Sequence, residues 1–324
     1  MEKQLFNILA VALLLIATIT TCKKEEPDAN GIKFDKTELD LLVGETVTLN
    51  PIFIPTNANK TASWESSDPN VATVDKGTVT GIAFGTTTIT VTIPSGRTAK
   101  CSVTVIQIIE PKMIRVDGGT FIMGCTEDDC FDNRELPAHP VTLSSFSIAQ
   151  YPVTQKEWVS LMGYNPSYYQ NGEDCPVGNV TWKEIQSYIQ KLNTYTGKNY
   201  RLPTEAEWEF AARGGNKSEH YIFSGSNNVH EVAWIDTYSH PVGTKKPNEL
   251  DIYDMSGNIF ETCNDFFGAY TDDPQINPQG PPIGDSRVIR GGSYGNDPFF
   301  SRIAYRMPRN NNASYNGGFR LALP

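Results

Sequence analysis

The sequence has no run of basic residues. Its 324 residues include 27 Lys and Arg against 37 Asp and Glu, scattered along the chain, for a formal net charge of −10. Proteins that bind a phosphate backbone gather Lys and Arg into patches that neutralise it. Nucleic acid is therefore not an expected partner.

Histidine is scarce, with four copies at His139, His220, His230 and His240. None has a second ligand at the HxxH or HxxxE spacing of a metal site, so the sequence gives no support to a facial iron triad. His139 and His240 each precede a proline. We expect these two to make structural hydrogen bonds.

The sequence also lacks a long apolar segment. The run from Ile8 to Ile19 follows a Lys-bearing start and is too short to cross a bilayer comfortably, which predicts an export signal over residues 1–22. Its end, ITTC, resembles the bacterial lipoprotein cleavage box, although Thr21 departs from the usual small residue. The resemblance implies that Cys22 is lipidated; the alternative is an uncleaved anchor or a plain secretory signal.

The segment KKEEP (residues 23–27) is similar to the tag that sends lipoproteins of Bacteroidetes-type bacteria to the outer face of the outer membrane. This similarity implies a cell-surface lipoprotein that is held to the outer membrane through its N-terminal lipid. Residues 23–30 are polar and would form a linker between the lipid and the first folded domain.

Cysteine is infrequent, with five copies besides Cys22. Cys125 and Cys130 enclose only TEDD, so a local disulfide is plausible and two free thiols are the alternative. A zinc-type site is not expected there, because no His or Cys pair lies at ligand spacing. Cys101 alternates with Val103 and Val105 and is predicted to be a buried core thiol; the pairing of the other cysteines stays open.

Residues 31–107 consist of short β-type runs separated by Gly, Pro, Asn and Asp, which predicts a small all-β sandwich. The stretch WESSDPNVATVDKGTVTGIAFGTTTITVT resembles the bacterial Ig-like group 2 module, including Trp64 and the strand that follows Gly85. Such modules act as spacers or as adhesive units, and we expect a spacer because no charged or aromatic cluster rises above the core pattern.

A second domain is predicted over residues 111–324. Apolar residues at helical spacing indicate helices at 154–163, 181–197 and 204–215, and the last two begin with capping boxes. After the third helix the chain is rich in Gly, Asn, Pro and aromatic residues and has little regular pattern. The chain is therefore predicted to be multidomain, with an Ig-like sandwich followed by an α+β domain rich in loops.

The sequence blocks of this second domain are similar, in order, to the formylglycine-generating enzyme (sulfatase-modifying factor) family, which implies a C-type-lectin-like fold. The blocks are MIRVDGGTFIMG (113–124), LPAHPVTLSSFSIAQYPVTQKEW (136–158), PVGNVTWKEIQSYIQKLN (176–193), YRLPTEAEWEFAARGG (200–215), KPNELDIYDMSGNIFE (246–261), RGGSY (290–294) and GGFRLAL (317–323).

Active members of that family oxidise a substrate cysteine with a copper ion that two cysteines hold in the loop after RGGS. The resemblance places those positions at Asn296 and Ser301. Cu(I) prefers thiolate or thioether ligands, so no copper is expected here. Ser293 lacks a GxSxG elbow. We expect a non-catalytic domain; the alternative is an active oxidoreductase or sulfatase-maturation enzyme of the family that uses other residues.

The resemblance also implies a structural calcium ion. Its ligands would be the carboxylates of Asp254 and Glu261 with backbone carbonyls of Gly257 and Ile259, an all-oxygen set that suits a hard cation. The alternative is that both acids only cap turns.

Aromatic residues follow the RGGS frame where a loop would normally carry polar ones, which favours a recognition surface for a protein or glycan ligand. Packing of these side chains in the core is the alternative. Two further hypotheses are a variable protein diversified by a retroelement and a structural component of a surface machine. The predicted ligand-binding residues are Tyr294, Asn296, Phe299, Phe300, Ser301 and Tyr305.

Overall fold

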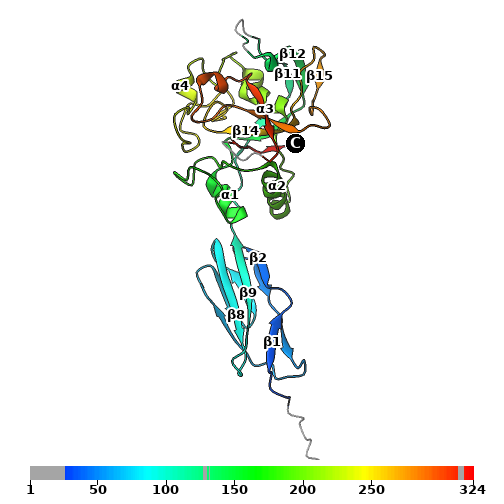
Figure 1. Cartoon of the computed structure of the whole chain (residues 1–324), viewed down its shortest axis with the longest axis vertical. Helices are drawn as coiled ribbons and strands as arrows, with labels where there is room; N and C mark the ends of the chain where they lie inside the picture. The colour runs from blue at the N-terminus through cyan, green and yellow to red at the C-terminus, as the bar shows by residue number, and fades with distance from the viewer. Residues whose placement is uncertain (1–25, 127–129, 131, 313–316) are drawn as a thin grey trace, which may run out of the picture.

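A computed structural model describes residues 26–126, 130, 132–312 and 317–324. The predicted export signal, Cys22 and residues 23–25 of the linker lie outside this range. Two regions follow one another end to end, with a narrow β-rich region at the N-terminal side and a larger mixed region beyond it (Figure 1). Within the described residues, the structure contains no helix that is long and apolar enough to cross a membrane.

The first region is the predicted β-sandwich. Its longest strands, β8 and β9, pair antiparallel, and their inward residues Ile89, Val91, Cys101, Val103 and Val105 are fully buried. Cys101 is thus the buried free thiol that the alternation predicted. The strands are β1 (Gly31–Phe34), β2 (Glu38–Leu42), β3 (Thr46–Thr48), β4 (Pro51–Ile54), β5 (Ser63–Ser66), β6 (Ala72–Asp75), β7 (Thr78–Gly81), β8 (Gly85–Thr92) and β9 (Thr98–Ile106), arranged as sheets β2-β9-β8-β5, β3-β7-β6 and β1-β4.

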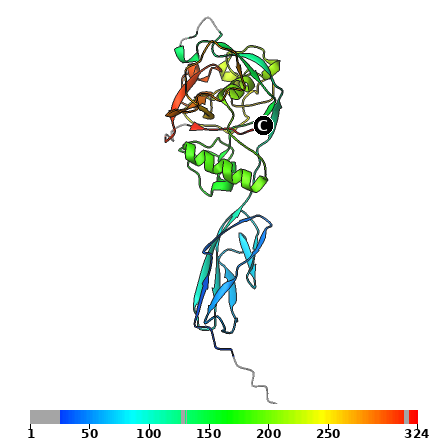
Figure 2. The ribbon, with the colours of Figure 1, turned by 90° about the vertical axis from the view of Figure 1, so that its right-hand side faces the viewer.

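The two regions share apolar contacts. Ile106, the last residue of β9, is buried in the same cluster as Trp158, Tyr188 and Phe319 of the second region, and Leu42 packs against that cluster. Figure 2 shows a helix of the second region directly above the end of the sandwich. The sandwich therefore continues into the core of the next domain.

The second region contains the three predicted helices, α1 (Gln155–Met162), α2 (Trp182–Thr196) and α3 (Glu205–Ala212), with a short α4 (Val229–Val232). Each of the first three begins with a capping box, in which a threonine and the glutamate three positions later exchange hydrogen bonds. Helix α3 ends earlier than predicted, because Gly214 adopts a φ of 87°, which a right-handed helix does not allow.

Short strands frame these helices. A four-stranded sheet, β17-β16-β14-β18, lies at the centre, and the C-terminal β19 pairs with β13 beside β10. The disulfide between Cys125 and Cys130 is formed, so the local pairing is confirmed. The strands are β10 (Met113–Val116), β11 (Gly119–Met123), β12 (His139–Leu143), β13 (Phe146–Ala149), β14 (Phe260–Phe266), β15 (Gln275–Ile276), β16 (Ser286–Arg290), β17 (Arg306–Asn310), β18 (Gly317–Gly318) and β19 (Ala322–Leu323).

Candidate functional site

The loop after β16 is anchored by one buried arginine. Arg290 is fully buried and its guanidinium donates to the carbonyls of Ile303 (2.7 Å) and Tyr305 (2.8 Å), at the far end of the loop. It also forms ion pairs with Glu205 and Glu209 of α3. The arginine of the RGGS frame therefore fixes where the loop leaves the sheet and where it returns.

The two positions that correspond to copper ligands in the resembling enzymes lie inside this loop. Ser301 is completely buried, and its Oγ would lie 2.6 Å from a Cβ added at Gly292, which explains the glycine there. The Oγ atoms of Ser293 and Ser301 and Oδ1 of Asn296 are buried without a hydrogen-bond partner among the described residues. These atoms are hard oxygens, so the loop offers no soft ligand to copper.

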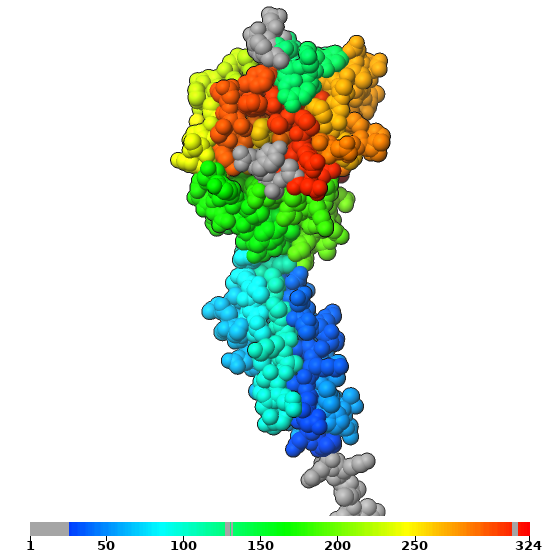
Figure 3. All heavy atoms as spheres, viewed as in Figure 1, coloured from blue at the N-terminus to red at the C-terminus, as the bar shows by residue number. Residues whose placement is uncertain are grey.

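Most aromatic residues of the loop pack against one another. Ring centroids of Phe299, Phe300 and Tyr305 lie 5.0–5.7 Å apart, and the three rings cover Phe260 and Ile289. The loop's surface lies beside the segment near residue 135 (Figure 3), where Arg302 and Glu135 form a buried ion pair. Edge-to-face packing of this kind is favourable for aromatic rings and orders the loop from within.

This packing corrects part of the predicted contact surface. Tyr305 is 2% exposed and Ser301 is not exposed, so neither can touch a partner. The sequence could not distinguish these positions, because burial in an irregular loop depends on residues distant in the chain. Asn296, Phe299 and Phe300 remain half-buried and accessible in part.

Tyr294 is largely buried as well, at 8% exposed, and it belongs to a neighbouring recess that the sequence analysis missed. The recess has a volume of about 100 Å³, and Tyr168, Tyr169 and Asn179 line it together with Tyr294. Tyr169 packs edge-on against Tyr294 (5.4 Å) and against Tyr168 (4.9 Å), which is 80% exposed. The three tyrosines at 164, 168 and 169 in a polar loop were the available signal.

A third loop adjoins this recess. The amide of Gly295 donates to the carbonyl of Asp236, and Ser239 lines the recess. In that loop the rings of Trp234 and His240 stack at 3.7 Å, with exposed Tyr238 beside them. We call the loops 164–169, 234–240 and 294–300 together the aromatic surface.

The predicted calcium ligands lie behind this surface. Glu261 forms a bidentate ion pair with Arg320, with both N–O distances at 2.6 Å, and also accepts a hydrogen bond from Trp208 (2.7 Å). Asp254 accepts from the Gly243 amide and from Asn258, and burial raises its pKa to about 6. Because N–H donors already satisfy both carboxylates, the calcium prediction rests on the resemblance alone.

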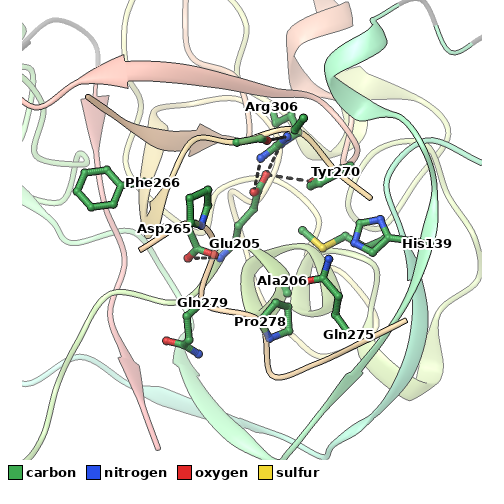
Figure 4. Close-up of a pocket in the computed structure, with 15 residues that line it drawn as sticks. His139, Glu205, Ala206, Asp265, Phe266, Tyr270, Gln275, Pro278, Gln279 and Arg306 are labelled. Carbon is green, nitrogen blue, oxygen red and sulfur yellow. Dashed lines mark hydrogen bonds and ion pairs between the residues drawn. The ribbon is translucent and has the colours of Figure 1, made fainter. Parts of the chain in front are cut away.

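A polar cavity lies at the N-terminus of α3, a site that the sequence analysis did not identify (Figure 4). Glu205 is at its centre and pairs with Arg306 through two 2.6 Å contacts, while Tyr270 donates to it at 3.1 Å. Asp265 accepts the amide N–H of Glu205 (2.9 Å). Burial, with the nearby charge of Glu205, raises the pKa of Asp265 to about 7.

The remaining candidate ligands for a catalytic metal are dispersed. Among the described residues, no group of three His, Cys, Asp or Glu side chains could hold a metal ion. Cys175 and Cys263 are buried free thiols, and burial raises the pKa of both. Neither thiol is therefore disposed to ionise as a nucleophile or a copper ligand.

An Ig-like sandwich followed by a loop-rich, C-type-lectin-like α+β domain defines the class of this protein. The chain belongs to the family described as the sulfatase-modifying factor enzyme 1-like domain, which matches residues 103–324. Residues 28–105 match the bacterial Ig-like domain (group 2). These matches confirm the resemblance that the sequence blocks indicated.

Similar proteins carry several different names. The chain is 35% identical over 217 residues to a chaperone protein LppX of Paenibacillus barcinonensis, covering 50% of this chain and 74% of that protein. It is 29% identical to a formylglycine-generating enzyme of Thermomonospora curvata, covering 58% and 84%. The serine/threonine-protein kinase pkn1 of Chlamydia pneumoniae is 32% identical, and the match spans 67% of this chain but only 38% of the kinase.

Two solved structures extend this comparison. The variable protein 1 of Treponema denticola superposes with a TM-score of 0.61 and 27% identity, covering 66% of this chain and 95% of that one. PvdO from Pseudomonas aeruginosa gives a TM-score of 0.59 and 28% identity, covering 65% and 94%. The shared fold thus occurs in proteins with unlike names, and function has to be inferred from the site.

Proposed function

We propose that the C-terminal domain is a non-catalytic recognition domain that binds a protein or glycan through the aromatic surface. The observation that carries this proposal is the amide of Asn296 and the hydroxyl of Ser301 at the positions of the family's copper thiolates. The loop keeps its buried Arg290 anchor without those ligands. A loop that has the family's anchoring arginine but lacks its metal-binding thiolates favours a binding role.

The composition of the aromatic surface supports binding. Tyr164, Tyr168 and Tyr238 are among the large apolar side chains exposed to solvent, at 43%, 80% and 42%. Tyrosine supplies contact area with few rotatable bonds and a hydroxyl for hydrogen bonding. The residues that line the recess carry no charge, although the chain has a net charge of −10. A neutral group of the partner therefore fits this recess best.

Alanine substitutions test the surface directly. Tyr168→Ala and Tyr238→Ala are expected to weaken binding to a positive member of a glycan or surface-protein array at least tenfold, with an unchanged unfolding midpoint. Ile276→Ala is a matched control, because Ile276 is 77% exposed and lies on β15, outside the aromatic surface. Equal binding by all three variants would refute the proposal.

The competing enzymatic role has its own test. Several relatives are named formylglycine-generating enzymes, so the family includes catalysts. The purified chain is incubated with Cu(I) and a peptide that carries the sulfatase motif. No formylglycine above a no-protein control is expected, because two thiolates are missing. Product above that control would establish the enzyme instead.

Attachment to the outer membrane through Cys22 remains part of the proposal. It rests on the ITTC and KKEEP segments, and a surface position would present the recognition domain on an Ig-like stalk. Cys22→Ala is expected to stall processing or release the protein into soluble fractions. Unchanged membrane association with no loss of lipid label would contradict it.

Two variants of this proposal predict different observations. A retroelement-diversified protein requires a near-copy of the DNA that encodes residues 294–306, beside a reverse transcriptase gene. Residues 313–316, near the C-terminus, lie outside the described residues. A component of a surface machine would instead co-purify with stable partners after mild solubilisation.

A further inference from the structure

The cavity at the N-terminus of α3 is separate in its residues from the aromatic surface. Side chains from α3, β11, β12, β14, β15 and β17 line it, and the loop 268–281 covers it. Its volume of about 240 Å³ is below the range of roughly 300–1,000 Å³ for sites that hold drug-sized ligands. A ligand for this cavity would therefore be small.

Most donor side chains of the cavity are committed already, with the exception of Gln275, whose side-chain amide forms no hydrogen bond with the described residues. Four hydrogen bonds from Arg306 go to Glu205 and to the carbonyls of Arg134 and Gly268. The Tyr270 hydroxyl donates to Glu205, and the amide nitrogen of Gln279 donates to the Asn277 carbonyl. These groups have little donor capacity left for a ligand.

The spare capacity consists mainly of acceptors. Asp265 is 3% exposed; its Oδ2 accepts the Glu205 amide, while Oδ1 has no hydrogen bond in the part of the chain that the structure describes. His139 Nδ1 lies 3.1 Å from the Pro137 carbonyl, which can only accept, so Nδ1 carries the proton and Nε2 is left as an acceptor. The side-chain oxygen of Gln279, an exposed residue, accepts no hydrogen bond from the described residues.

The charges that line the cavity also favour a ligand that donates hydrogen bonds. Arg306 is bound to Glu205, and Asp265 forms no ion pair among the described residues. A buried carboxyl without a cationic partner is unfavourable in its charged form, and a cation that donates hydrogen bonds relieves both deficits. Anionic ligands would meet two carboxylates and committed donors.

We propose that this cavity binds a small organic cation with a primary ammonium group, which donates to Asp265 Oδ1 and to neighbouring acceptors. An ammonium group has three donors and no acceptor, matching the spare groups of the wall. The inference concerns a second site and does not depend on the recognition role of the aromatic surface.

Calorimetric titration of the full-length chain in detergent, at low salt, tests this site. The probes are 1,4-diaminobutane, ethanolamine, 1,4-butanediol and succinate, chosen to vary charge at similar size. Binding of the diamine at least tenfold tighter than the diol, with no binding of succinate, is expected. Equal affinity for diamine and diol would mean a neutral polyol site, and absence of diamine binding at millimolar concentration would overturn the proposal.

Asp265→Asn is the decisive variant. Its side-chain oxygen can still accept the Glu205 amide, so the start of α3 keeps its cap while the charge is lost. Diamine affinity is expected to fall at least tenfold. Asp272→Asn is the matched control, because Asp272 is an exposed acid in the same loop and should leave affinity unchanged. Equal losses of diamine affinity in both variants would mean that the general negative charge of the protein attracts the diamine, which would contradict a specific site at Asp265. If Asp265→Asn fails to fold, the probe series on the unmodified chain decides alone.

Discussion

The two regions of the molecule are stabilised in different ways. In the described part of the β-sandwich, Thr87 alone among the polar side chains is fully buried, and the core consists of Val, Ile, Leu, Ala, Phe and Cys. The C-terminal domain buries five arginines together with glutamates and aspartates. The buried arginines are Arg290, Arg302, Arg306, Arg309 and Arg320.

The difference follows from the length of regular backbone in each region. Strands of the sandwich bury alternate side chains against a neighbouring strand, so local pattern is enough to build a core. The C-terminal domain has long irregular segments, whose carbonyls and turns need side-chain donors. The ion pairs of its buried arginines join residues 59 to 167 positions apart and so connect distant segments of the chain to the central sheet and to α3.

This contrast bears on the aromatic surface. Arg290 and Arg302 hold the loop of residues 291–305 from beneath, through α3 and Glu135. These ion pairs therefore anchor the loop through side chains other than Asn296, Phe299 and Phe300.

Removal of the central arginine gives the largest expected effect. Arg290→Ala removes a positive charge that neutralises the buried carboxylates of Glu205 and Glu209, and it leaves two backbone carbonyls without their hydrogen-bond donor. The free energy of unfolding should therefore fall by about 3–5 kcal/mol. Denaturant unfolding of the purified chain measures it. Arg115→Ala is the control, because the Arg115–Asp117 pair is exposed and should contribute under about 1 kcal/mol. Similar losses in both variants would refute the proposed role of buried charge.

A cavity in the core of the β-sandwich should lower the stability of the sandwich by an amount comparable to, or smaller than, the loss expected for Arg290→Ala. Leu41→Ala removes a fully buried side chain from β2, and a loss of about 2–5 kcal/mol is expected for that region. Val43→Ala, at a 45% exposed position nearby, should change stability little. Because Ile106 and Leu42 enter the next core, the second domain is expected to unfold at the same or a slightly lower midpoint.

Two buried aspartates make the stability of the C-terminal domain depend on pH. The pKa values of Asp265 (about 7) and Asp254 (about 6) are raised above the unfolded value of about 3.9. Between about pH 4 and pH 7 the native state binds more protons than the unfolded state, so these two groups lower stability as pH rises through that window. Asp265→Asn should therefore match the unmodified domain near pH 4 and exceed its stability by up to a few kcal/mol above pH 7. A difference that does not change with pH would contradict this assignment.

Calcium is expected to have the smallest effect. An ion at Asp254 and Glu261 at about a hundredfold excess over its Kd would add roughly 2.7 kcal/mol, less whatever it costs to displace Arg320 from Glu261. Melting in EDTA and in millimolar calcium measures the gain, and Asp254→Ala should abolish it. Equal midpoints in both buffers would show that the ion pair with Arg320 fulfils the structural role.

Several features of the fold were predictable from local sequence. Thr181 with Glu184 and Thr204 with Glu207 mark helix starts, because a capping box needs only four consecutive residues. The end of α3 was predicted too late, since the Ala-Arg-Gly-Gly sequence does not show which glycine adopts a positive φ. In the candidate site, the sequence alone showed that Asn296 and Ser301 stand where the resembling enzymes have copper-binding cysteines.

The sequence by itself determined the alternation of the sandwich, the helix starts and the family of the second domain, and it left the local disulfide open against two free thiols. Each depends on neighbours in the chain or on an ordered set of motifs. Only the tertiary structure decided that Tyr305 is buried while Tyr168 is exposed. It also decided that Asp265 lines a cavity and forms no ion pair with any described residue. In irregular backbone, burial and charge balance are set by contacts between residues far apart in sequence, which no local pattern encodes.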